Sequence, residues 1–151
     1  MFDNQSVTVI GNITPSPTHP KGSLYSKNDV LPQQNLIDYV ETKLATLQDD
    51  WDGYGGCAID KNVLAHTLFI FNHIPNTLLK YVDKDNVLPT ANGTITIEWN
   101  NGSSELLLDV GKDFSTYYIQ NQRYTEIINN KFVVSDGEQM ATFISELKQY
   151  F

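Results

Sequence analysis

The sequence has little of what several functional classes require. Its 151 residues include one cysteine, Cys57, which excludes an internal disulfide, and one arginine, Arg123. The formal net charge is −8 at pH 7, which argues against binding to nucleic acids or anionic membranes and favours a partner protein with a basic surface. No apolar run reaches the roughly 18 residues of a membrane span, and residues 1–5 lack the features of a signal peptide. These absences predict a cytoplasmic protein.

The chain length fits one globular domain. A chain of this size buries roughly 70% of the surface of its unfolded form, so it needs neither a disulfide nor a structural metal to fold. We expect that domain to span residues 33–151. Residues 1–32 differ, because three prolines between positions 15 and 20 exclude a helix or a central strand. We predict an extended Pro- and Asn-rich arm there, free in solvent or lying along a groove, and the β-prone residues 6–10 leave addition to a sheet edge open.

Apolar residues at helical spacing predict three helices. The first spans about residues 33–48, and the second opens after Asp60, which is a good N-cap residue. Ser135 and Glu138 form a capping-box pattern at the start of the last helix.

The apolar period changes to two after residue 89, which predicts strands. Residues 94–99 and 105–110 flank Asn101-Gly102, a strong hairpin signal, and a third strand covers residues 115–121. A fourth lies at residues 124–128 or 131–134, with a turn at residues 129–130. The element order predicts an α+β two-layer fold, with an antiparallel meander of three to five strands packed against two N-terminal helices and one C-terminal helix.

Glu98 and Glu105 lie on the polar face of the predicted hairpin. A register with Ile97 opposite Leu106 places the two carboxylates directly opposite each other. Like charges in this position are unfavourable, so we expect water, Lys112, a cation or a basic residue of another protein to offset them. A glycosidase carboxylate pair has this pattern, as does any solvated sheet face. We predict partner binding by the two glutamates.

An acidic, aromatic segment follows the first predicted helix, with the residues Asp49, Asp50, Trp51, Asp52 and Tyr54. It is no calcium loop, because Gln48 would be the first ligand and Ile59 the last. The glycines after it are no phosphate loop either, since the Lys-Ser/Thr pair is absent. We predict that the tryptophan anchors the loop and that the five residues form a partner-binding surface, because acids steer association and aromatics supply affinity.

His66 and His73 lie seven residues apart on the second predicted helix. Their Cα atoms are then roughly 10 Å apart, which is unsuitable for a shared metal. Phe69 between them makes this face unusual for a monomer, so we predict that it contacts a partner or a second copy. Cys57 has no nearby cation to activate it, and we expect a small buried or half-buried side chain.

Two motifs together carry a resemblance. Trp51-Asp52-Gly53-Tyr54-Gly55, and Gly93-Thr94-Ile95-Thr96-Ile97-Glu98-Trp99 after an intervening helix, are similar to a set of small bacterial and phage-borne proteins with a W-D-G-Y-G turn and a G-x-I-x-x-E-W strand. The resemblance covers about residues 36–121 and departs at residues 56–59, where the family has a small residue and a proline. The family has no established activity, so the resemblance implies an α+β core and nothing catalytic.

The sequence therefore predicts a non-enzymatic acidic protein that occupies a partner protein's surface, as an antitoxin, an immunity protein or a defence inhibitor does. It predicts no cofactor and no metal, and self-association stays open. One alternative is a small-molecule or nucleotide-binding module that stacks its ligand on Tyr117, Tyr118 and Tyr124. The other is a carboxylate-dependent hydrolase centred on Glu98 and Glu105.

Overall fold

A computed structural model describes residues 30–123 and 126–151. The predicted N-terminal arm lies outside the described residues up to position 29, as does the start of the predicted fourth strand at positions 124 and 125. The fold below is that of Leu31–Phe151.

Four α-helices and two 3-10 turns form in the described residues, within these bounds: α1 Pro32–Thr42, η1 Leu44–Thr46, α2 Lys61–His73, α3 Asn76–Leu79, η2 Lys84–Asn86 and α4 Gly137–Tyr150. The first helix is shorter than predicted, because the backbone of Lys43 leaves the helical region with φ −120° and the chain tightens into η1. The predicted cap at Asp60 is confirmed, since its side chain accepts the N–H of Asn62. At α4 the predicted cap Ser135 is wrong. The side chain of Asp136 caps this helix instead, because it accepts the N–H groups of Glu138 and Gln139.

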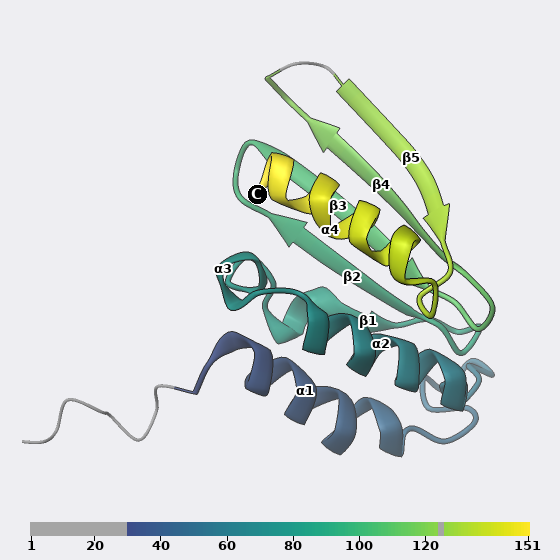
Figure 1. Cartoon of the computed structure of the whole chain (residues 1–151). Coiled ribbons are helices and arrows are strands. Elements are labelled where there is room, and N and C mark those ends of the chain that lie inside the picture. The colour runs from purple at the N-terminus through teal and green to yellow at the C-terminus, as the bar shows by residue number, and fades with distance from the viewer. Residues whose placement is uncertain (1–29, 124–125) are drawn as a thin grey trace, which may run out of the picture. The chain divides into compact units, whose positions relative to one another are not determined.

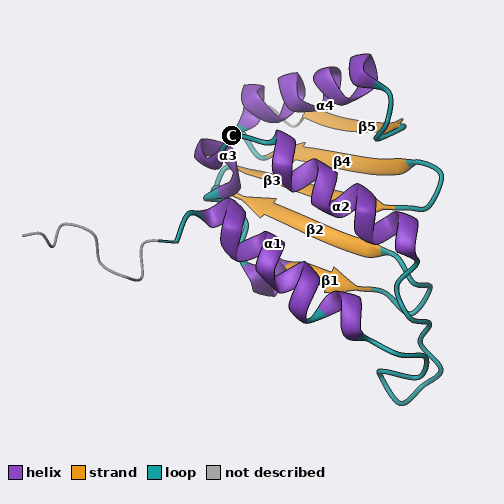
Figure 2. Cartoon of the chain, turned by 60° about the horizontal axis from the view of Figure 1, so that its bottom comes forward, coloured by secondary structure: helices purple, strands orange, loops and turns teal. Residues whose placement is uncertain are grey.

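In the described ranges, five strands form one sheet in the order β1-β2-β3-β4-β5, with these bounds: β1 Val87–Pro89, β2 Ile95–Asn100, β3 Ser104–Val110, β4 Ser115–Asn121 and β5 Glu126–Phe132. Every neighbouring pair is antiparallel, so the sheet is a meander. Figures 1 and 2 show that α1, α2 and α4 all lie on one side of it. The predicted α+β two-layer fold is confirmed.

At the two edges of the sheet the strand predictions are incomplete, although β5 overlaps the predicted fourth strand. The short β1 was not predicted, and the expected turn at Asn129 and Asn130 is wrong because β5 runs straight through both residues. Asn130 stays in the strand with its side chain engaged: Oδ1 accepts the Lys131 N–H at 2.9 Å and Nδ2 donates to the Tyr117 hydroxyl at 3.3 Å. Asparagine side chains can therefore support a strand that their turn preference would end.

The hairpin register differs from the prediction by two residues. Ile97 pairs with Leu108, so the predicted partner Leu106 is wrong. The turn explains the shift: Asn101 Oδ1 accepts the Ser104 N–H at 2.8 Å, and Gly102 with φ +90° lies at the first central position. Because a shift of two keeps every side chain on its face, the predicted apolar face is correct.

The core lies between the sheet and its helices. Its largest fully buried side chains are Trp99 of β2, Phe71 of α2 and Phe143 of α4. Phe143 stacks on Phe132 with ring centroids 4.7 Å apart and meets the edge of Tyr117 at 4.9 Å. These aromatic contacts fix α4 on the β4–β5 half of the sheet.

The two motif segments meet at the start of β2. Cys57 donates its N–H to Ala91 O at 2.9 Å, and Asp60 donates to Gly93 O at 3.1 Å. Gly93 has φ +79°, and a Cβ there would lie 2.8 Å from Ala58 O. Only glycine suits this position, so the junction depends on Gly93.

We expect Gly93→Ala to lower the free energy of unfolding by about 1 to 2 kcal/mol. Alanine is strained in the left-handed region, and its Cβ would clash with Ala58 O. Urea denaturation measures the effect. Gly137→Ala is the matched control, because nothing lies within 4 Å of a Cβ at that helical position. Equal stability of the two variants would contradict the proposed constraint.

Candidate functional site

The predicted partner-binding residues lie on three separate elements. Asp49, Asp50, Trp51, Asp52 and Tyr54 belong to the segment of residues 49–57, which we call the acidic loop. Glu98 and Glu105 alternate with the buried residues of β2 and β3, so they lie on the sheet face opposite the helices, which we call the open face. His66, Phe69 and His73 lie on α2. Partner binding by these residues stays a prediction, and the geometry shows what each group can contribute.

Two carboxylates close the acidic loop on its own backbone. Asp52 Oδ1 accepts the N–H groups of Tyr54 and Gly56, both at 2.9 Å. Asp50 Oδ1 accepts the Gly55 N–H at 2.8 Å, and the backbone of Asp50, in the left-handed region with φ 68°, donates to Gly56 O at 2.6 Å. These hydrogen bonds hold the loop in one shape.

The base of the acidic loop is fixed in the same way. Asp49 Oδ1 accepts the Ala58 N–H at 2.9 Å, and Trp51 Nε1 donates to Cys57 O at 3.1 Å. The indole of Trp51 is half-buried and lies against Gly56, in agreement with its predicted anchoring role. Cys57 is exposed, so its predicted burial is wrong: its backbone serves the junction while its side chain faces solvent.

Tyr54 lies near the middle of this fixed loop with 95% of its surface exposed. Two backbone N–H groups hold the pKa of the Asp52 carboxyl below its usual value, because they favour the charged form. The Tyr54 N–H contributes most and the Gly56 N–H is next. The loop therefore combines a fixed backbone, negative charge and one fully presented aromatic ring.

The open face has three rows of paired side chains. The middle row joins Glu98, Leu107, Tyr118 and Asn129 across four strands. Next to it lies the row Asn100, Glu105, Gln120 and Ile127, and on the other side the row Leu88, Thr96, Asp109, Thr116 and Lys131. The long helices α1, α2 and α4 lie on the other side of the sheet (Figure 2).

The expected direct opposition of Glu98 and Glu105 is wrong, because Glu98 pairs with Leu107 and Glu105 pairs with Asn100. The two glutamates are instead diagonal neighbours, and both line a hollow of about 250 Å³. Its other open-face walls are Asn100, Leu107, Tyr118 and Gln120. The register separates the like charges while keeping both carboxylates at one cavity.

Neither glutamate has a cationic partner among the described residues. Glu98 Oε2 accepts a hydrogen bond from Asn86 at 3.3 Å, and Glu105 Oε1 accepts one from Asn100 at 3.0 Å. Of the four groups expected to offset the two charges, Lys112 does not do so, because its amine lies 4.0 Å from Asp60 at the acidic-loop junction. The hollow therefore has two carboxylates with no cation beside them in the described part of the chain.

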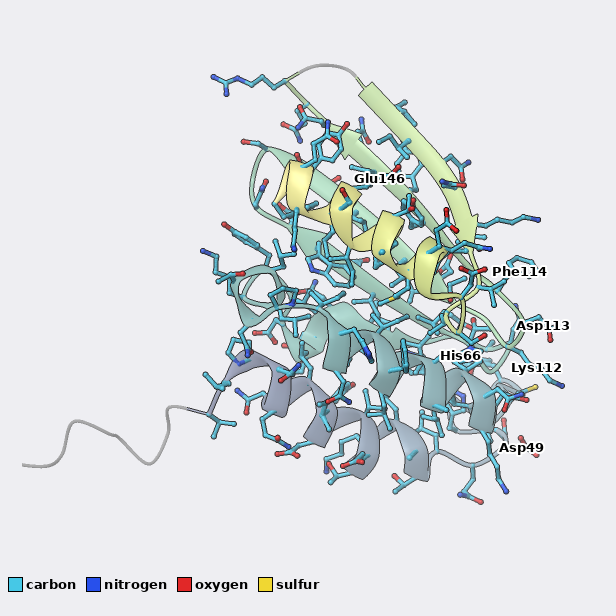
Figure 3. All side chains as sticks on the ribbon, viewed as in Figure 1. Asp49, His66, Lys112, Asp113, Phe114 and Glu146 are labelled. Atoms are coloured by element: carbon cyan, nitrogen blue, oxygen red, sulfur yellow. The ribbon has the colours of Figure 1, made fainter. Side chains whose placement is uncertain are left out.

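The α2 residues divide between two environments. Phe69 is 40% exposed, and its ring stacks on His73 with centroids 3.9 Å apart. His66 is half-buried, and its Nδ1 lies 3.1 Å from Gly111 O beside the turn that carries Lys112, Asp113 and Phe114 (Figure 3). The two histidines contact different backbone carbonyls, His66 that of Gly111 and His73 that of Phe69. No group of three metal-ligating side chains occurs in the described part of the chain.

The tyrosines predicted to stack a ligand do not form one wall. Tyr117 is 2% exposed on the helix-covered face, whereas its neighbour Tyr118 lies on the open face, because successive strand residues point to opposite sides. The third member, Tyr124, lies outside the described residues.

Sequence reasoning missed a hydrogen-bonded contact between α4 and the sheet. The Tyr117 hydroxyl donates to Glu146 Oε2 at 2.5 Å, and Glu146 lies on α4 above the strands (Figure 3). Burial, together with the Glu146 carboxylate, raises the pKa of Tyr117 well above its usual value. Residue spacing gave no signal for this pair, because the two residues lie 29 positions apart.

No protein-family model matches the chain, and no curated protein or solved structure matches it either. The two-motif resemblance therefore stays a prediction. No helix in the described ranges has the length and apolar character needed to cross a membrane.

We expect the backbone amide signals of Tyr54 and Gly56 to titrate with a midpoint below 3.8, the ordinary pKa of an aspartate. The lowered pKa means that the Asp52 carboxylate orders the loop above that pH and releases it as pH falls through the folded-state pKa. NMR spectra recorded from pH 6 downward measure the step, and Asp52→Asn is expected to remove it. A midpoint at or above 3.8 would contradict this role.

We expect Tyr117→Phe to lower the free energy of unfolding at neutral pH by about 1 to 2 kcal/mol, because Glu146 loses its donor. The raised pKa means that the tyrosine's contribution is complete below pH 10, its unfolded value, and declines above it. Urea denaturation of both proteins should therefore show a stability difference that shrinks as pH rises past 10. A difference that stays constant there would exclude the linkage.

Proposed function

We propose that the protein is a non-enzymatic binding protein that occupies a basic surface of a partner protein, in the manner of an antitoxin, an immunity protein or an inhibitor of a defence enzyme. One observation carries the proposal: Tyr54 is 95% exposed on a loop whose backbone is fixed by its own carboxylates.

A fixed loop favours binding because little conformational entropy remains to be lost. Ordering flexible groups is a large part of the cost of association, and a preorganised loop avoids it. Tyrosine is enriched among the residues that contribute most to protein–protein affinity, since it supplies a large contact area with few rotatable bonds. Tyr54 therefore has the geometry of an anchor residue for a pocket on another protein.

The charge of the chain defines the kind of partner. A net charge of −8 accelerates association with a basic protein, and salt screens that attraction. The loop N–H groups that donate to Asp52 favour its charged form, so this carboxylate adds negative charge next to Tyr54. We therefore expect the dissociation constant of the complex to rise steeply with salt.

We expect Tyr54→Ala to weaken the partner complex about 30-fold, the effect of losing a central aromatic contact of about 2 kcal/mol. The full chain serves as bait in lysate of its native host, and the basic protein that salt releases is then titrated against purified variants. Leu31→Ala is the control, because Leu31 is also an exposed apolar residue, at 60% exposure, but precedes α1. Salt-insensitive binding, or equal affinities of the two variants, would exclude the proposal.

A further inference from the structure

We propose that the hollow of about 250 Å³ between Glu98 and Glu105 on the open face binds an arginine side chain of a partner protein. This surface is made of strand residues and is distinct from the acidic loop, so the inference goes beyond the role proposed for Tyr54. Its occupant is defined by the charge and shape of the walls.

The sheet pairing builds the hollow. Glu98 lies opposite Leu107, and Glu105 lies two residues before Leu107 on β3, so the carboxylates approach from two adjacent strands. At such diagonal positions Cα atoms are about 7 Å apart, which is within reach of long side chains on a common ligand. Tyr118 of β4 continues the row beyond Leu107 and closes the hollow on the side opposite Glu98.

The carboxylates have acceptor capacity left for a ligand. Each accepts one hydrogen bond from an asparagine, Glu98 through Oε2 and Glu105 through Oε1, and no described residue donates to the other oxygen of either group. Since neither has a cationic partner in the described ranges, a bound cation would face two uncompensated charges. Charge complementarity therefore selects a positively charged occupant.

The geometry favours a guanidinium over an ammonium group. Arginine presents five N–H donors in a plane, so one side chain can reach two separated carboxylates, whereas lysine places a point charge against one of them. A guanidinium also packs on an aromatic ring, which Tyr118 offers, and the arginine methylenes can cover Leu107, which is 41% exposed. The walls of the hollow therefore offer carboxylates to the N–H donors of an arginine, an aromatic ring to its guanidinium plane and an apolar side chain to its methylenes.

The same charge disfavours a second copy as the occupant. A net charge of −8 repels a copy of the chain, and the three carboxylates of the open face, those of Glu98, Glu105 and Asp109, would face each other across a symmetric contact. Lys131 is the one cation in the three rows of the open face, and its amine lies 5.2 Å from the centre of the Phe114 ring. A basic partner is therefore the occupant to which we commit.

The test uses capped tripeptides with the sequences Ala-Arg-Ala, Ala-Lys-Ala and Ala-citrulline-Ala, titrated at low salt into the full-length, ¹⁵N-labelled protein. Citrulline has nearly the shape of arginine without its charge. We expect amide shifts confined to β2, β3 and β4 around Glu98, Glu105 and Tyr118, with the tightest binding for arginine, weaker binding for lysine and none for citrulline.

Paired variants separate the hollow from general charge. We expect E98Q combined with E105Q to weaken binding of the arginine peptide at least about tenfold, since charged hydrogen bonds are lost while the amide oxygens can still accept from Asn86 and Asn100. E41Q combined with E138Q makes the same charge change at exposed helical positions and is expected to bind like the original protein.

Three results would overturn the inference: equal binding of arginine and citrulline peptides, equal loss in both double variants, or shifts that centre on residues 49–57. Open-face shifts that change with protein concentration and without peptide would assign the surface to a second copy instead. Failure here leaves the Tyr54 proposal intact, because that proposal is decided by the separate comparison of Tyr54→Ala with Leu31→Ala.

Discussion

One-sided coverage of the sheet is the constraint on which the rest of the structure depends. The helices α1, α2 and α4 pack on the same face, so β2, β3 and β4 bury every second residue and leave the others more exposed to solvent. Trp99 is buried for this reason, while its neighbours Glu98 and Asn100 lie on the open face. The burial that stabilises the fold therefore also assembles the polar rows. Glu98 could reach the other face only if its neighbours Ile97 and Trp99 left the core.

In the acidic loop, side chains that we propose for partner binding also hold the loop's own backbone. The carboxylates of Asp49, Asp50 and Asp52 accept backbone N–H groups, replacing hydrogen bonds that a helix or strand would supply. For Asp52 these N–H donors also lower the pKa of the carboxyl, because they favour the ionised form. Composition alone assigns these acids to a partner surface, whereas the geometry shows that they also hold the backbone around Tyr54 in one shape.

The apolar periodicity of the sequence predicted which strand residues share a face, but it did not predict the strand register, which depends on the turn. The third predicted strand matches β4 at both ends, and the apolar face of the hairpin is correct, because alternation follows directly from burial. The pairing of Glu98 with Leu107 was missed, since it depends on whether Asn101-Gly102 or Gly102-Ser103 occupies the centre of the turn, and both are good turn sequences. The hydrogen bond from Tyr117 to Glu146 depends on tertiary packing that no local pattern carries.

Backbone hydrogen bonds join the acidic loop to the strand that carries part of the open face. The N–H groups of Cys57 and Asp60 bind the turn that leads into β2, and Glu98 follows in that same strand. A contact through a single side chain in a shallow hollow is weak, and so is a contact through one loop. When both surfaces meet one partner, the second contact forms at high effective concentration without a further loss of rotational freedom. Gly93, which touches no proposed ligand, then affects affinity through the spacing of the two surfaces.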